Sequence, residues 1–181
     1  MTIIAGLVHA GGVTIAADSY GVVGQSELDK TAMPKIWRMD RAVVGSSGTY
    51  LLNQLLRYVV PLDLPADPDA VFSYLVVTYS PAIHAALKER DGLAEGNQRP
   101  GNVLLGCDGR LYRIDGNGSV VLLKGPFAAI GCGCDYATGA YWALNAAAAE
   151  PEPLDRLHMV VQLAIDLDTH CNGPVLMEST P

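Results

Sequence analysis

The sequence contains no uninterrupted apolar stretch of membrane-spanning length, because charged residues, Gly or Pro interrupt each apolar run. No basic segment precedes an apolar one near the first residue, so we expect no secretory signal and predict a cytoplasmic protein. The 12 Lys and Arg are outnumbered by 19 Asp and Glu, which gives a net charge of −7. This acidic balance argues against nucleic acid or an anionic membrane as a partner.

Cysteines are few, and their spacing does not indicate a disulfide framework or a metal site. Without a visible secretory signal, Cys107, Cys132, Cys134 and Cys171 are expected to be free thiols. Cys132 and Cys134 are one residue apart rather than in the CxxC spacing, and no second ligand pair accompanies them. We therefore expect neither a metal nor a cofactor.

The composition fits one globular domain over residues 1–181. Half of the 181 residues are hydrophobic, which is enough for a sizeable core. The sequence also shows no internal repeat, low-complexity tract or domain linker.

The apolar pattern predicts strands in two groups, each followed by helices. Strands are expected over residues 2–9, 12–17, 35–39, 42–46, 102–107, 110–115, 119–123 and 127–131, with a possible last strand at 174–177. Helices are expected over 49–60, 69–90 (with a kink or boundary at Pro81), 135–149 and 154–170. Residues 19–34 and 91–101 are expected to be irregular. This order predicts an α+β fold with antiparallel sheets and helices packed outside them.

Thr2 is the first candidate catalytic residue. It opens a predicted strand directly after Met1, and threonine is small enough for methionine to be trimmed in front of it. Removal of Met1 would place a hydroxyl and a free α-amine on one residue. The α-amine has an unperturbed pKa of about 8, so it can act as the base that activates the hydroxyl.

Three further segments place polar residues at strand ends. Asp18 ends the strand that pairs with the first one, and Lys35 begins the next predicted strand. A lysine beside a carboxylate and a nucleophile lowers the hydroxyl pKa and stabilises developing charge. Ser47 and Gly48 form a small-residue corner before a helix, where backbone N–H groups can bind an oxyanion. Taken singly, each segment also has a purely structural interpretation as a turn, an edge charge or a helix cap.

Together these segments resemble the proteasome β-type peptidases, including the bacterial HslV branch of the N-terminal nucleophile (Ntn) hydrolases. The resemblance covers nearly the whole chain in order, and the spacing from Thr2 to Asp18 is its most specific part. The matching segments are residues 2–4, 11–19, 35–36, 45–48, 128–133 and 168–173. The resemblance implies a four-layer αββα sandwich of two antiparallel sheets flanked by helices.

The resemblance also implies a role for each matched residue. Thr2 would be the nucleophile of a threonine peptidase, provided Met1 is removed, with Asp18 and Lys35 as its charged pair. The Gly48 N–H, with Ser47 adjacent, would hold the oxyanion. Asp168 would complete the polar network near the amine.

Cys132 and Cys171 stand where this family usually has serine. Cysteine is a weak hydrogen-bond donor, so the two replacements would alter proton handling at the Thr2 amine. If the two thiols lie close together, the site is expected to be redox-sensitive; otherwise both are inert core residues.

By resemblance, the chain would form a homo-oligomeric ring or stacked rings that enclose the active sites. Substrates would be unfolded polypeptides, and an ATP-dependent unfoldase is a plausible partner. Two alternatives remain open: an Ntn amidase acting on a small amide, and a non-catalytic structural ring subunit.

Overall fold

Two antiparallel sheets form the centre of the computed structural model, which describes residues 2–23, 27–30, 33–147 and 151–181. The four-stranded sheet has the order β10-β1-β2-β11, and the five-stranded sheet has the order β5-β6-β7-β8-β9. The strands of the first sheet are β1 (Ile3–His9), β2 (Gly12–Ala17), β10 (Phe127–Gly131) and β11 (Leu176–Ser179). Those of the second are β5 (Ile36–Met39), β6 (Ala42–Ser46), β7 (Val103–Cys107), β8 (Arg110–Ile114) and β9 (Val120–Leu122).

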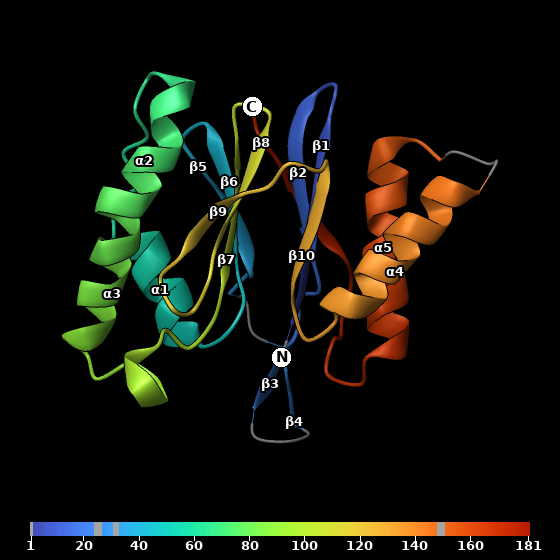
Figure 1. Cartoon of the computed structure of the whole chain (residues 1–181). Helices are drawn as coiled ribbons and strands as arrows, with labels where there is room; N and C mark the ends of the chain where they lie inside the picture. Colours follow the sequence, from blue (N-terminus) through green and yellow to red (C-terminus); the bar gives the residue numbers. More distant parts are fainter. Residues whose placement is uncertain (1, 24–26, 31–32, 148–150) are drawn as a thin grey trace.

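Helices cover the outer face of each sheet, as Figure 1 shows. The five-stranded sheet is covered by α1 (Tyr50–Tyr58) and by the continuous helical segment η1 (Pro68–Ala70), α2 (Val71–Tyr74), η2 (Leu75–Tyr79) and α3 (Ser80–Lys88). The four-stranded sheet is covered by α4 (Cys134–Ala146) and α5 (Pro153–Leu167). The chain is therefore an α+β sandwich with the layers helix, sheet, sheet, helix, as predicted.

Strand β1 shows how the alternating sequence produces these layers. Ile3, Ala5 and Leu7 pack against the α4–α5 side, whereas Ile4 points into the core between the two sheets. Successive side chains of a strand point to opposite faces, so an apolar residue at every position fills a layer on each side. In this way, β1 is buried on both faces and holds the chain start at the edge of the sandwich.

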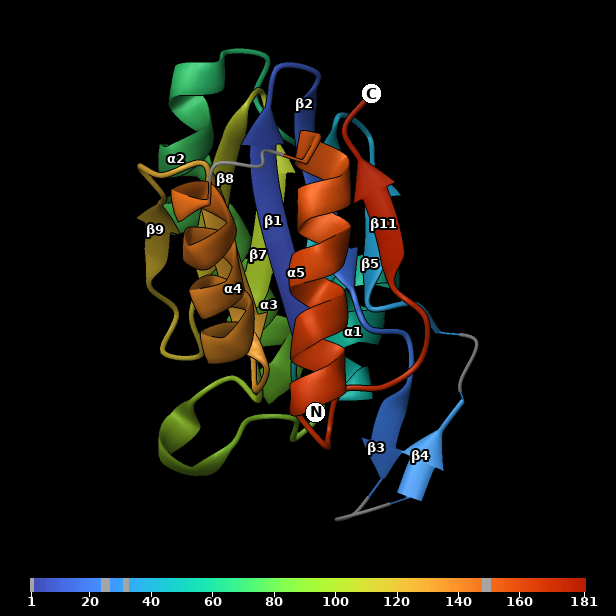
Figure 2. The same cartoon turned by 90° about the vertical axis from the view of Figure 1, so that its right-hand side faces the viewer.

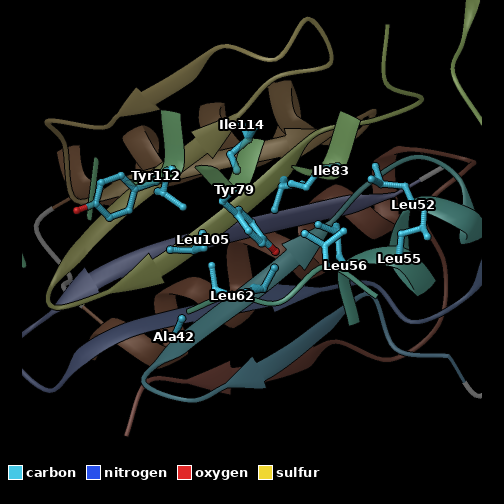
Figure 3. Packing of buried hydrophobic residues seen from close by; sticks show 14 of the residues in the cluster. Ala42, Leu52, Leu55, Leu56, Leu62, Tyr79, Ile83, Leu105, Tyr112 and Ile114 are labelled. Carbon is cyan, nitrogen blue, oxygen red and sulfur yellow. The ribbon is translucent and has the colours of Figure 1, made fainter. Parts of the chain in front are cut away.

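A third core lies between the five-stranded sheet and its helices. Tyr79 and Ile83 from the helical segment meet Leu105 of the sheet, with Leu52 and Leu56 of α1 alongside (Figure 3). All five side chains are almost fully buried. The helical segment Pro68–Lys88 is long and apolar enough to cross a membrane by length and composition alone. However, its residues at four-residue intervals are buried in this core, which is the pattern of an amphipathic core helix.

The structure corrects several predicted boundaries. Residues 19–34 are not wholly irregular, because β3 (Gly21–Val23) and β4 (Glu27–Asp29) pair as a small ribbon that stands away from both sheets (Figure 2). Strands of three residues are too short to show a periodic pattern. The predicted loop 91–101 contains the short helix η3 (Glu95–Asn97). Residues 168–170 lie beyond the end of α5, and residues 148 and 149 of a predicted helix lie outside the described residues.

The boundary predicted at Pro81 is confirmed, with an unexpected form. The helix changes to a π-helical turn over η2 directly before α3, where Pro81 lies in the first turn. Proline cannot donate to a carbonyl of the preceding turn, and a π-helical turn accommodates the altered bonding without breaking the helix.

Candidate active site

Thr2 lies at the wall of a small cavity at the start of β1. It is 5% exposed, and its carbonyl packs against the end of β10. There Gly131 has a φ of +93°, and a Cβ added to it would lie 2.1 Å from the Thr2 carbonyl oxygen. Only glycine permits this approach. The cavity has a volume of about 230 Å³ and is lined by Thr2, Ser47, Gly48, Gly101, Gly131 and Cys132.

Asp18 and Lys35 form a buried ion pair next to this cavity wall. Lys35 Nζ lies 2.8 Å from Asp18 Oδ1, and both residues are buried. The same Oδ1 accepts the Ile3 N–H at 3.0 Å, while Oδ2 accepts the Asn172 N–H at 3.1 Å. Since Ile3 directly follows Thr2, one carboxylate positions both the chain start and the ammonium group.

The electrostatics of this pair reflect opposing causes. Burial raises the pKa of the Asp18 carboxyl, whereas Lys35 and the two backbone N–H donors act in the opposite direction. The cation is therefore what makes a charged carboxylate tolerable at this depth.

The corner at Ser47 and Gly48 is held against a second loop. The Ser47 N–H donates to the Asn102 carbonyl at 3.0 Å, and the Ser47 hydroxyl contacts the backbone of the same residue. Gly48 has a φ of +114°, and an added Cβ would lie 2.0 Å from the Pro100 carbonyl oxygen. The hydrogen bonds among the described residues leave the Gly48 N–H without an acceptor. Gly48 precedes α1, and the N-terminus of a helix favours negative charge. An oxyanion in the cavity can therefore accept a hydrogen bond from the Gly48 N–H.

Cys132 connects the chain start to a second polar cluster. The Thr2 N–H donates to Cys132 Sγ at 3.2 Å, and Cys132 Sγ lies 3.7 Å from Cys171 Sγ. Asp168 lies beside both thiols and accepts the His170 N–H at 2.9 Å. The two thiols are thus in contact, which agrees with the prediction that they lie close together.

The hydrogen bonds within this cluster shift the ionisation of its members. The hydrogen bond from Cys171 lowers the pKa of the Cys132 thiol, and the pKa of Cys171 is raised by the same bond and by burial. Burial acts to raise the pKa of Asp168, but the His170 N–H and the neighbouring thiols lower it overall. The lowered pKa of Asp168 favours a carboxylate beside Cys132, whose sulfur contacts the Thr2 nitrogen.

The structure brings all eight candidate residues to one edge of the sandwich. Three touch the cavity beside Thr2, which are Ser47, Gly48 and Cys132. The others reach Thr2 through Ile3 (Asp18 and Lys35) or through Cys132 (Asp168 and Cys171). Met1, whose removal the predicted chemistry requires, lies outside the described residues.

Two supporting residues were missed by sequence reasoning. Gly101 lines the cavity, and a Cβ there would lie 1.9 Å from the Ser47 carbonyl oxygen. Asn172 holds Asp18 through a backbone N–H. A Pro-Gly pair at residues 100–101 was a visible turn signal, but nothing local shows that this turn packs against a corner 50 residues earlier. A backbone donor such as that of Asn172 leaves no mark on residue type.

No family model matches the sequence, and no curated protein matches it. Solved structures do match. BPH from Thiobacillus denitrificans, in complex with epoxomicin, superposes with a TM-score of 0.80 at 25% identity, over 99% of this chain and 100% of that chain. HslV from Trypanosoma brucei gives 0.70 at 19% identity over 98% of each chain. Anbu (ancestral beta-subunit) from Yersinia bercovieri gives 0.67 at 16% identity over 99% of this chain and 82% of that chain.

These neighbours are HslV- and proteasome-like peptidases, and the chain shares their fold over nearly its whole length. The predicted resemblance to the Ntn hydrolases is therefore confirmed at the level of the fold. Identities of 16% and 19% show a common fold but not a common activity. The chemistry of the site is therefore argued from its own residues.

Proposed function

We propose that this chain is a threonine peptidase that uses Thr2 as an N-terminal nucleophile after Met1 is removed. One observation carries the proposal. Thr2 borders a cavity that Gly48 also lines, and the Gly48 N–H has no acceptor among the described residues. The residue after Thr2 is held by the Asp18–Lys35 pair. The site thus combines a nucleophile, an oxyanion donor and a cation, which are the parts that acyl transfer needs.

The proposed reaction is an acyl transfer in two stages. Thr2 Oγ attacks the scissile carbonyl carbon while the Thr2 amine accepts the hydroxyl proton. The Gly48 N–H stabilises the resulting oxyanion, and the positive potential of Lys35 favours the deprotonated hydroxyl. The C–N bond then breaks, the amine passes its proton to the leaving nitrogen, and a water hydrolyses the ester on Thr2.

Cys132 and Asp168 contribute to this reaction by proximity to the amine. Cys132 Sγ is 3.2 Å from the Thr2 nitrogen, and a carboxylate oxygen of Asp168 lies within 4.8 Å of that sulfur. The negative charge of the Asp168 carboxylate stabilises the ammonium form that arises during the attack. Cys171 orients Cys132 through the thiol–thiol hydrogen bond.

We also propose that the chain assembles into a homo-oligomeric ring or stacked rings. The HslV and Anbu neighbours support this, since the latter is itself described as a beta-subunit. The outer faces of α4 and α5 carry exposed apolar side chains that a second copy would cover: Tyr136, Trp142, Met159, Leu163 and Leu167. Within such a ring we expect unfolded polypeptide substrates, delivered in the cytoplasm by an ATP-dependent unfoldase.

The direct test compares Thr2→Ala and Thr2→Ser with the unmodified chain on a panel of fluorogenic peptides. Both replacements keep a small residue after Met1, so processing is retained. Thr2→Ala should abolish hydrolysis and leave the oligomeric state by gel filtration unchanged. Thr2→Ser keeps the hydroxyl and should retain measurable activity. Hydrolysis by Thr2→Ala at the unmodified rate would exclude Thr2 as the nucleophile.

The same panel separates the two alternatives. An Ntn amidase acting on a small amide would leave every peptide uncleaved while Thr2 still reacts with a threonine-directed β-lactone. A structural ring subunit would show neither activity nor adduct. The presence of Thr2, Asp18 and Lys35 together favours a catalytic subunit over a structural one.

A further inference from the structure

Cys132, Asp168 and Cys171 bring three potential metal ligands together from distant parts of the chain. One sulfur or oxygen atom from each lies within 4.8 Å of the others. Cys132 follows β10, Asp168 directly follows α5, and Cys171 lies in the next turn. This site is not predictable from local spacing, because its ligands do not follow the CxxC pattern.

The spacing of the two sulfurs fits a tetrahedral ion. Zinc–sulfur bonds of about 2.3 Å at tetrahedral angles separate two thiolates by about 3.8 Å. The observed distance from Cys132 Sγ to Cys171 Sγ is 3.7 Å. Two thiolates and one carboxylate leave a single vertex open.

The Thr2 nitrogen lies beside one of the three ligands. It is 3.2 Å from Cys132 Sγ, and a nitrogen and a sulfur bound to one zinc ion are about 3.6 Å apart. This nitrogen is therefore the candidate for the open vertex. An amide nitrogen has no lone pair to offer, so only the free amine left by Met1 removal can be the fourth ligand.

The surroundings also suit a metal. His170 donates its backbone N–H to Asp168 Oδ1, and its Nδ1 lies 3.2 Å from the same oxygen, so the carboxylate is held in place. Cys132 lines both the 230 Å³ cavity beside Thr2 and a 640 Å³ cavity that also contains Asp168 and His170. An ion can thus reach Cys132 from either cavity.

We propose that Cys132, Cys171 and Asp168 bind a thiophilic divalent cation, with Zn²⁺ as the best fit, and that the Thr2 amine is the fourth ligand. Binding releases the thiol protons to solvent and occupies the amine lone pair. The regulatory part of this inference rests on the proposed function, because the same lone pair is the base of the peptidase. Zinc would then inhibit hydrolysis reversibly.

Cobalt(II) titration tests the site without relying on activity. Chain with Met1 removed, as checked by mass, is stripped with a chelator and kept reduced with a phosphine, which does not compete for the metal as a dithiol does. Co²⁺ should produce a thiolate-to-cobalt charge-transfer band that saturates at one ion per chain and is displaced by Zn²⁺. Cys132→Ser and Cys171→Ser should weaken binding by at least about tenfold, as loss of a ligand exceeds the loss of an outer partner.

Cys134→Ser is the matched control. Cys134 is near Cys132 in sequence, but its sulfur contacts Asp135 and lies outside the cluster, so the band should persist. Absence of the band in the unmodified chain, or an equal band in Cys132→Ser and Cys171→Ser, would overturn the site. Peptide hydrolysis is recorded on the same samples with zinc and after added EDTA.

The two proposals fail in different ways. A cobalt band in a chain that cleaves no peptide even when it is metal-free contradicts the proposed function and supports the metal site. Hydrolysis that zinc-loaded chain carries out at the metal-free rate overturns the regulatory role of the ion.

Discussion

Lys35 Nζ donates to Asp18 Oδ1 at 2.8 Å and to the Tyr20 carbonyl at 2.7 Å, in a part of the molecule that excludes most solvent. This pair joins the end of β2 to the start of β5, one from each sheet. It therefore contributes to the sandwich as well as to the site, and its removal has consequences for both.

Lys35→Met should abolish peptide hydrolysis and destabilise the fold by about 3–5 kcal/mol at neutral pH, because it leaves Asp18 buried without a cation. Burial already raises the Asp18 pKa, and loss of Lys35 raises it further. A raised folded-state pKa means that the folded chain binds the proton more tightly than the unfolded chain. The destabilisation should therefore shrink as the pH falls through that pKa, as measured by denaturant unfolding at pH 5 and pH 8.

The double variant Asp18→Asn with Lys35→Met is the control. It removes both charges and keeps one acceptor oxygen, which can serve the Ile3 N–H or the Asn172 N–H but not both. Part of the lost stability should return, but not the activity. Equal destabilisation of Lys35→Met at both pH values would contradict the ion-pair account.

Gly48→Ala keeps the backbone N–H but should displace it from the cavity, and hydrolysis should then fall by about a hundredfold, the usual cost of losing an oxyanion donor. The new Cβ would collide with the Pro100 carbonyl in a backbone conformation that costs alanine about 1–3 kcal/mol. Gly125→Ala is the matched control, since a Cβ there meets nothing within 4 Å. Equal peptidase rates for the two variants would remove Gly48 from the site.

Gly139→Ala should stabilise the chain by about 0.5–1 kcal/mol. Gly139 is inside α4, where glycine is a poor helix former, and an added Cβ meets nothing within 4 Å. Thermal unfolding should show a higher Tm with unchanged peptide hydrolysis. A lower Tm would mean that this face of α4 is covered in the assembled protein.

Diamide should reduce activity by joining Cys132 to Cys171. The sulfurs are 3.7 Å apart and must approach to about 2.05 Å, which displaces Cys132 from the Thr2 nitrogen. Dithiothreitol should restore the activity, and Cys134→Ser should respond as the unmodified chain does. Equal activity after diamide and after dithiothreitol would mean that the two thiols are inert.

Most of the fold could be predicted from the sequence. The strands β1 and β2 consist mainly of apolar residues, and the apolar residues of the helices recur at intervals of three or four. The π-helical turn before Pro81 and the β3–β4 ribbon were missed, because both depend on backbone bonding that short stretches of side chains do not encode.

The candidate site divides in the same way. Thr2 and Asp18 stand at the paired ends of β1 and β2, so their proximity follows from the strand pairing. Lys35 precedes β5 in the other sheet, and its contact with Asp18 follows from how the two sheets pack. The contact of Cys132 with Cys171 follows only from how α5 and its following turn pack on β1 and β10. No local pattern predicts packing over that distance in sequence.

The measurement that tests the central claim most directly is the intact mass of the purified chain, before and after incubation with a threonine-directed β-lactone. We predict a mass that lacks Met1, one covalent adduct per chain, and no adduct on Thr2→Ala. A chain that retains Met1 and takes up no lactone would contradict the N-terminal nucleophile and favour a structural subunit.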